Sequence, residues 1–146
     1  MILLDTNILS ALIQRRPDPT VVDWLNQQRA DELWISGITI FEAHYGFESM
    51  ADGKRRRRLE AAFMALVRED LGNRVLGFGQ SAAAKAATLA AERKAAGRPV
   101  DMRDTFIAGI AMANGATLVT GNTRHFDDVA VPVFDPWRAT RTTDRA

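Results

Sequence analysis

The sequence predicts a single α/β domain with a central, mostly parallel sheet of four or five short strands flanked by helices. Short continuous apolar runs, typical of strands that are covered on both faces, occur at residues 1–4, 33–36, 75–78 and 117–120. Stretches with apolar residues at helical spacing separate these runs. The length of 146 residues suits one domain. We therefore expect one folded unit over residues 1–137.

Composition excludes several classes of site. The chain has no cysteine, so it has no disulfides, thiolate nucleophiles or cysteine-bound zinc. Its formal net charge of +1 gives no global reason to bind a polyanion. No basic segment precedes the first apolar run, and Asp5 interrupts that run after four residues. We therefore expect neither a signal peptide nor a membrane anchor, and a cytoplasmic location.

The first strand, residues 1–4, runs directly into Asp5, Thr6 and Asn7. In open α/β sheets the carboxyl ends of parallel strands present the groups that bind ligands. Asp5 is therefore a candidate site residue. The alternative is that Asp5 or Thr6 caps the helix that starts near Asn7, and the strand alone does not decide between them.

A second helix follows residues 15–19, where two prolines end the first one. Asp18 or Thr20 can cap this second helix. Its apolar stripe either covers the sheet or forms, together with the first helix, a groove for a partner.

The second strand, residues 33–36, leads into a helix over residues 39–50. Thr39 and Glu42 have the spacing of a capping box, which would place Glu42 in the first turn of that helix. The box explains Glu42 without any catalysis. It also places this carboxylate just after a strand, so Glu42 can serve as a ligand from a cap-like position.

The next helix, ending near residue 71, begins with a basic block. Adjacent cations at a helix start oppose the helix dipole, so the block either lies on a solvated surface or contacts an anionic partner such as RNA. The block consists of Lys54, Arg55, Arg56, Arg57 and Arg58.

Two helices follow the strand at residues 75–78: one from Gln80 or Ser81 to residue 96, and one from Asp101 to Gly115. Asp101 fits the N-cap of the latter, and Gly115 fits its C-terminal stop. Asp104 falls in its first turn, on the same face as apolar residues further along the helix. A carboxylate on a buried side needs a partner or a metal ion.

The fourth strand, residues 117–120, repeats the opening pattern because Asn122 and Thr123 follow it closely. Residues 124–128 suit a loop or a single turn, and residues 131–134 suit a last edge strand. We expect residues 138–146 to form a flexible tail.

The polar residues at two strand ends and two helix starts belong on one side of a parallel sheet if its βα units wind right-handed. Clustered carboxylates repel one another unless a cation lies between them, and an oxygen-only donor set indicates Mg²⁺ or Mn²⁺. Such ions activate water for phosphodiester hydrolysis. Thr6 and Ser10 could orient the waters or a phosphate. The four candidate catalytic residues are Asp5, Glu42, Asp104 and Asn122.

Four stretches resemble, in the right order and over nearly the whole chain, the PIN-domain ribonucleases of the VapC toxin type, from type II toxin–antitoxin systems. They are LLDTNILSAL, ITIFEAHYGFE, RDTFIAGIAMANGATLVTGNTRHF and VPVFDPW. The resemblance implies an endoribonuclease with Asp5, Glu42 and Asp104 as ligands of Mg²⁺ or Mn²⁺, Asn122 in the fourth position and Thr6 in support.

The sequence departs from the family pattern at His125, because an aspartate is frequent at this position. The departure concerns the binding site of a second metal ion, not that of the first. Asp127 could compensate through a water, and His125 could contact a phosphate of the RNA. The resemblance also implies a homodimer, and an antitoxin whose C-terminal segment packs over the first helices and blocks the site.

Two other functions compete with this one. The first is a PIN-like binding module without activity, against which the intact set of three carboxylates argues. The second is a Mg²⁺-dependent phosphatase with Asp5 as its nucleophile, which would need a second acid two residues later. That position is Asn7.

Overall fold

The computed structural model describes residues 1–138 and has a five-stranded, fully parallel sheet at its centre, with strand order β3-β2-β1-β4-β5. This confirms the predicted α/β fold with a mostly parallel sheet. The strands are β1 (Ile2–Leu4), β2 (Leu33–Ser36), β3 (Val75–Leu76), β4 (Thr117–Val119) and β5 (Val133–Phe134).

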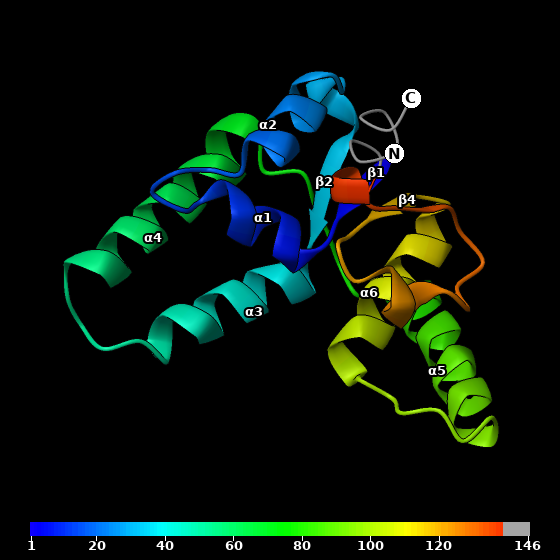
Figure 1. Cartoon of the computed structure of the whole chain (residues 1–146). Coiled ribbons are helices and arrows are strands. Elements are labelled where there is room, and N and C mark those ends of the chain that lie inside the picture. Colours follow the sequence, from blue (N-terminus) through cyan, green and yellow to red (C-terminus); the bar gives the residue numbers. More distant parts are fainter. Residues whose placement is uncertain (139–146) are drawn as a thin grey trace.

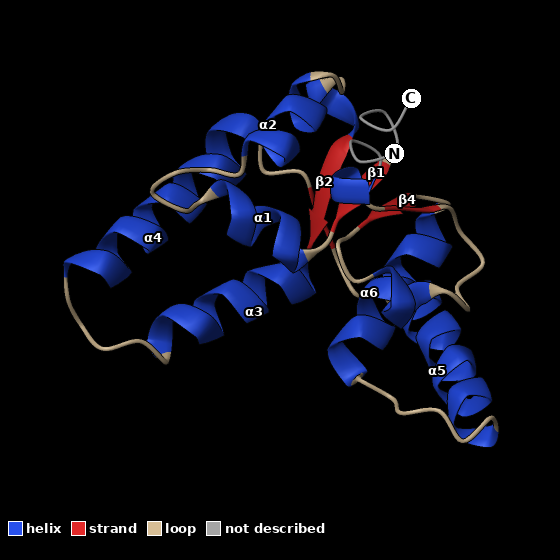
Figure 2. Cartoon of the chain, in the orientation of Figure 1, coloured by secondary structure: helices blue, strands red, loops and turns tan. Residues whose placement is uncertain are grey.

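Helices lie on both sides of the sheet (Figures 1 and 2). One layer contains α1 (Thr6–Leu12), α2 (Pro19–Asn26), α3 (Gly37–Glu48) and α4 (Lys54–Ala65). The other layer contains α5 (Gln80–Ala95) and α6 (Met102–Asn114). The short helical turns are η1 (Ala30–Glu32), the π-helical η2 (Leu66–Asp70) and η3 (Thr123–Phe126).

The central strand β1 supplies both halves of the core. Leu4 packs in the cluster formed with α1 to α4, whereas Leu3 packs in the cluster formed with α5 and α6. Both leucines are fully buried. Successive side chains of a strand point to opposite faces, so a strand covered by helices on both faces needs a continuous apolar run. This is the physical basis of the pattern at residues 1–4.

Close packing of α5 against α6 fixes the position of α6, which carries Asp104. A Cβ atom at Gly109 of α6 would lie 2.5 Å from the carbonyl oxygen of Ala82 and 2.8 Å from the Cβ of Ala86. Only a glycine therefore fits at this contact. The small side chains of the alanine-rich α5 permit this close approach.

The predicted capping box at Thr39 and Glu42 is wrong. Helix α3 begins two residues before Thr39, and its N-cap is Ser36, whose Oγ accepts a hydrogen bond of 3.1 Å from the Thr39 N–H. Ser36, three residues before Thr39, takes the cap role because it is the last residue of β2 and directly precedes α3. Glu42 therefore lies in the second turn of α3, and capping does not explain it.

Other helix boundaries agree with the sequence. Asp18, rather than Thr20, caps α2, and Asp101 caps α6 by accepting a hydrogen bond from the Asp104 N–H. Gly115 ends α6 in the left-handed conformation, with φ of 59°. Of the predicted tail, only Arg138 lies within the described residues. Over residues 1–138, none of the helices is long and apolar enough to cross a membrane.

Candidate active site

Asp5 directly follows β1 and lies next to the end of β4, where the strand order of the sheet reverses. Ligands of open α/β sheets bind at such a reversal. Asp5 is 4% exposed. Its Oδ1 accepts a hydrogen bond of 2.8 Å from the Thr6 N–H, and its Oδ2 accepts one of 2.7 Å from the Thr120 hydroxyl. Asp5 is thus both the N-cap of α1 and a buried carboxylate, so the two readings of the sequence are compatible.

Asn7 and Thr120 belong to this site although the sequence analysis did not select them. The Asn7 Nδ2 donates to Asp5 Oδ2 at 3.2 Å and to the Thr120 hydroxyl oxygen at 3.1 Å. The Asn7 Oδ1 accepts the Gly121 N–H at 3.1 Å, which ties the ends of β1 and β4 together. A signal existed for Thr120, because it is the last residue of an apolar run, in the place equivalent to Asp5.

The environment of Asp5 disfavours its charge. Burial raises the pKa of this carboxyl from 3.8 to about 6, against the opposing effect of the hydrogen bonds from Thr120 and Thr6. The negative charges of Asp104 and Glu42 add to the rise. The three carboxylates are therefore close enough to influence one another.

Glu42 reaches the same region from α3. Its Oε1 accepts a hydrogen bond of 3.0 Å from the Thr6 hydroxyl, which also lies 3.0 Å from the Thr39 hydroxyl. Its Oε2 lies 3.9 Å from a guanidinium nitrogen of Arg103 on α6. Burial raises the pKa of Glu42; Thr6 and Arg103 oppose this rise, and Asp104 adds to it. Thr6 thus lies between two of the predicted ligands.

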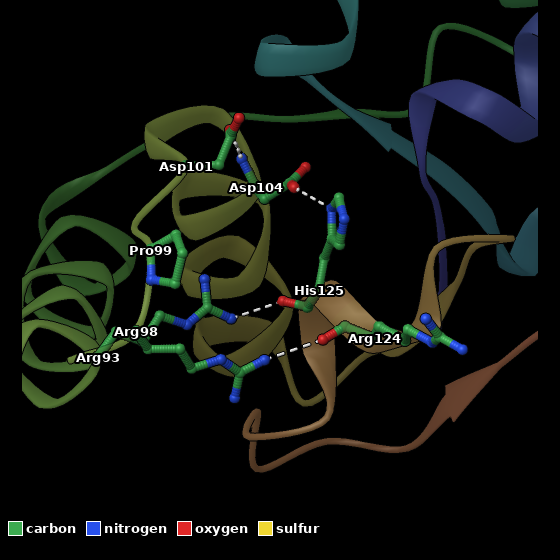
Figure 3. Close-up of a pocket in the computed structure, with 7 residues that line it drawn as sticks. All are labelled: Arg93, Arg98, Pro99, Asp101, Asp104, Arg124 and His125. Atoms are coloured by element: carbon green, nitrogen blue, oxygen red, sulfur yellow. Dashed lines mark hydrogen bonds and ion pairs between the residues drawn. The ribbon is translucent and has the colours of Figure 1, made fainter. Parts of the chain in front are cut away.

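Asp104 lies in the first turn of α6, half-buried, and its partner is a histidine. Its Oδ2 is 2.7 Å from Nδ1 of His125, which belongs to η3 (Figure 3). The expectation that Asp104 needs a partner is met by a side chain that follows β4. His125 itself is 56% exposed.

The side chains of the other three predicted site residues make no hydrogen bond or ion pair with these carboxylates within residues 1–138. Asn122 is exposed and makes its described hydrogen bonds through its backbone, one of them from its N–H to the Thr120 hydroxyl oxygen at 3.0 Å. Asp127 pairs with Arg98 at 2.7 Å. Ser10 is exposed on α1. Roles for these three residues remain predictions.

The basic block forms the start of α4, at the outer end of that helix and well away from the end of β1 (Figure 1). Arg56 pairs with Glu48 at 3.1 Å and with Glu60 at 2.7 Å. Arg57 pairs with Asp52 at 3.4 Å. The remaining three cations, Lys54, Arg55 and Arg58, are exposed and have no ion-pair partner within residues 1–138. The block is thus only partly neutralised.

Two hollows adjoin the carboxylates. A groove of about 210 Å³ runs between α1, α3 and α4, with Thr6, Ser10 and Glu42 on its polar side and mainly apolar side chains along the rest. A second hollow of about 280 Å³ lies between η3 and the loop before α6, with Asp104 and His125 on its wall (Figure 3).

The donor chemistry of the site fits a hard divalent cation, because Asp5, Glu42 and Asp104 offer only carboxylate oxygens. Within residues 1–138, however, no three acidic or histidine side chains are gathered tightly enough to form a preassembled metal site. Each of the three carboxylates instead has a partner of its own. Asp5 and Glu42 accept hydrogen bonds from neighbouring side chains, and Asp104 contacts His125.

Comparison with known proteins identifies the fold family. The family model of the PIN domain matches residues 2–132. The plasmid stability protein StbB of Pseudomonas syringae pv. tomato is 39% identical over 139 residues, which cover 95% of this chain and 100% of that protein. The VapC ribonuclease Y4jK of Sinorhizobium fredii is 34% identical, with 94% and 98% covered.

A comparison with solved structures supports the same family. The crystal structure of FitAcB from Neisseria gonorrhoeae contains a chain that superposes with a TM-score of 0.83 at 31% identity, covering 94% of this chain and 99% of that one. The family model spans most of the chain, and both relatives exceed 30% identity over nearly their whole length. This chain therefore belongs to the PIN domain family.

Proposed function

We propose that this protein is a Mg²⁺- or Mn²⁺-dependent endoribonuclease that acts as the toxin of a toxin–antitoxin pair. The observation that carries the proposal is the buried Asp5 at the strand-order reversal of a PIN fold, with Glu42 and Asp104 close enough to raise its pKa. Relatives named as ribonucleases support it, among them Y4jK and a tRNA(fMet)-specific endonuclease of Shigella flexneri that is 31% identical.

Asp5, Glu42 and Asp104 would hold the cation, with Asn122 beside them. When bound, such an ion lowers the pKa of a water and stabilises negative charge that develops on a phosphate. The protein's own part is to orient the carboxylates. Thr120 and Asn7 fix Asp5, whereas Thr6 fixes Glu42.

RNA would approach over the open side of these carboxylates. We propose that His125 and the exposed cations of the basic block, Lys54, Arg55 and Arg58, contact its phosphates. Because the start of α4 lies away from the end of β1 in the fold (Figure 1), the block would bind a remote part of the RNA, not the scissile phosphate. RNA is abundant in the cytoplasm, and a chain without cysteine suits that compartment.

An antitoxin would bind the groove between α1, α3 and α4. The similar structures include the FitAB and VapBC assemblies, which supports a partner protein of this kind. Leu9, Ile13 and Phe47 line the groove, and Glu42 lies at its polar side. An apolar segment of the antitoxin that fills the groove would therefore cover one of the proposed cation ligands.

We also propose a homodimer. Phe41 and Tyr45 of α3 stack on each other with ring centroids 5.9 Å apart, yet they are 56% and 59% exposed. Exposed aromatic pairs of this kind are typical of interfaces. Light scattering of the purified protein tests this point. We expect the mass of a dimer for the wild type and the mass of a monomer for Tyr45→Ser. A monomer mass for the wild type would refute the homodimer.

The competing functions are less well supported. The amide of Asn7 donates to Asp5, so it offers no acid for a phosphatase mechanism. An inactive binding module would have no need for a carboxylate kept charged against the cost of burial.

The deciding experiment is cleavage of total cellular RNA by the purified protein, with Asp5→Ala alongside. Discrete cuts that require both Asp5 and Mg²⁺ or Mn²⁺, and that stop with EDTA, are expected. Cleavage that persists in Asp5→Ala or in EDTA would refute the metal-dependent mechanism. No cleavage and no stabilisation by Mn²⁺ would favour the binding module.

A further inference from the structure

Arg93 is a buried cation near the end of α5, and its side chain is only 4% exposed. Its Nε and Nη2 donate to the two carboxylate oxygens of Asp128 at 2.8 and 2.7 Å. Removing a guanidinium from water is costly, and only well-formed hydrogen bonds compensate for it. The bidentate pair with Asp128 provides two such bonds and fixes the plane of the guanidinium.

The remaining donors of Arg93 reach both sides of the Asp104–His125 contact. Its Nη2 donates to the backbone carbonyl of His125 at 2.6 Å, and its Nη1 donates to the Thr105 hydroxyl oxygen at 3.3 Å. Thr105 is fully buried and directly follows Asp104 on α6. The planar guanidinium of Arg93 thus links His125 to Thr105, the residue next to Asp104.

The Asp104–His125 contact depends on a restraint of this kind, because its two residues are 21 positions apart and belong to different elements. The imidazole is 56% exposed, so packing of the ring does not fix it. Phe126 anchors η3 in the core, but apolar packing is not directional. The Arg93 hydrogen bond to the His125 carbonyl is directional and sets the position of that residue relative to α6.

We infer that Arg93 is a positioning residue of the candidate site. Through Asp128 and the His125 carbonyl it fixes η3 against α6, so that the imidazole of His125 holds Oδ2 of Asp104 and leaves Oδ1 for a cation (Figure 3). Partners that orient a ligating carboxylate strengthen metal binding in this way. The role toward the cation rests on the proposed function, whereas the placing of His125 does not.

The first test uses Arg93→Met in the metal-free protein. The measurement is the ¹⁵N resonances of the His125 ring, with Asp104→Asn as the reference for a changed acceptor. We expect the wild type to show a hydrogen-bonded Nδ1 and Arg93→Met to show the signals of a free imidazole. Wild-type ring signals in a folded Arg93→Met protein would overturn the inference.

A matched control separates positioning from general stability. Arg74 is another guanidinium that joins distant segments, donating to the carbonyls of Leu33, at 2.9 Å, and Ala30. Arg74→Met removes a comparable clamp far along the chain from η3. We expect its His125 signals to match the wild type, and changed signals in this variant would overturn the specific role of Arg93.

The second test measures Mn²⁺ affinity by electron paramagnetic resonance. We expect Arg93→Met to bind Mn²⁺ about 10 to 100 times more weakly than the wild type, the usual effect of losing a partner behind a metal ligand. Arg74→Met should bind within about twofold. Equal affinity in Arg93→Met would refute the role toward the cation. No Mn²⁺ binding by the wild type would refute the proposed function instead, and the ring signals would still decide the placing of His125.

Arg93→Lys provides a conservative variant if the methionine variant does not fold. A lysine keeps the charge next to Asp128, but its single ammonium does not reproduce the planar fork that contacts the His125 carbonyl and Thr105. We therefore expect a folded protein with the ring signals of a free imidazole. Full rescue of the wild-type signals by lysine would overturn the inference, because charge alone would then suffice.

Discussion

The raised pKa of Asp5 makes the stability of the metal-free protein depend on pH in an unusual direction. Its pKa rises from 3.8 to about 6 on folding. The folded state therefore holds this proton more tightly than the unfolded state. Asp5 lowers the free energy of unfolding as the pH rises from about 3 to about 7, most steeply between the two pKa values. At 1.36 kcal/mol per pKa unit, the loss is about 3 kcal/mol.

Urea unfolding in EDTA at several pH values between 4 and 8 measures this loss. Asp5→Asn is the control, because it has no proton to exchange at this position. The amide that replaces the carboxylate faces the Nδ2 donor of Asn7. We therefore expect the free energy of unfolding of the variant to be shifted by an amount that does not depend on pH. The difference between wild type and variant should change by about 2.4 kcal/mol between pH 4 and pH 7, because the unfolded carboxyl is already partly ionised at pH 4. A difference that does not vary with pH would refute the reasoning.

Three further variants test other parts of the site. Thr120→Val removes the fully buried hydroxyl that donates to Asp5 Oδ2. We therefore expect the free energy of unfolding, measured with urea, to fall by about 1–3 kcal/mol, and an unchanged value would contradict this role. Asp104→Asn should abolish RNA cleavage and keep the circular dichroism of the wild type; retained cleavage would remove Asp104 from the ligand set. Changing Lys54, Arg55 and Arg58 to glutamine should lower the salt slope of RNA binding by about 2, at roughly 0.7 per phosphate contact, and an equal slope would show that the block is only a solvated surface.

The fold was predictable because the three central strands, β1, β2 and β4, are largely buried on both faces. That burial requires apolar runs, and the runs at β1, β2 and β4 are visible in the sequence without any knowledge of the partner strands. The strand ends then bring Asp5 and Thr120 together, since parallel neighbours end at the same edge of the sheet. This part of the site follows from local pattern and from the handedness of βα units.

Other parts of the site were not predictable from local pattern. Ser36 and Thr39 both suit an N-cap, and only the true start of α3 shows that Ser36 is used. The contact between Asp104 and His125 depends on where η3 lies against α6, which the packing of α5 and a buried Arg93 determine. Residues that meet across such sequence separations leave no periodic signal.

The donors around Asp5 explain how a buried carboxylate can still serve as a metal ligand. Burial alone favours the protonated form, and a cation would then have to displace a proton before it could bind. Thr120 and Thr6 donate to Asp5 and lower its pKa, so that it ends near 6 and the group is mostly ionised at pH 7. The remaining cost of the buried charge destabilises the metal-free protein. A cation that binds here removes that cost, so its stabilising effect should be larger at pH 7 than at pH 4.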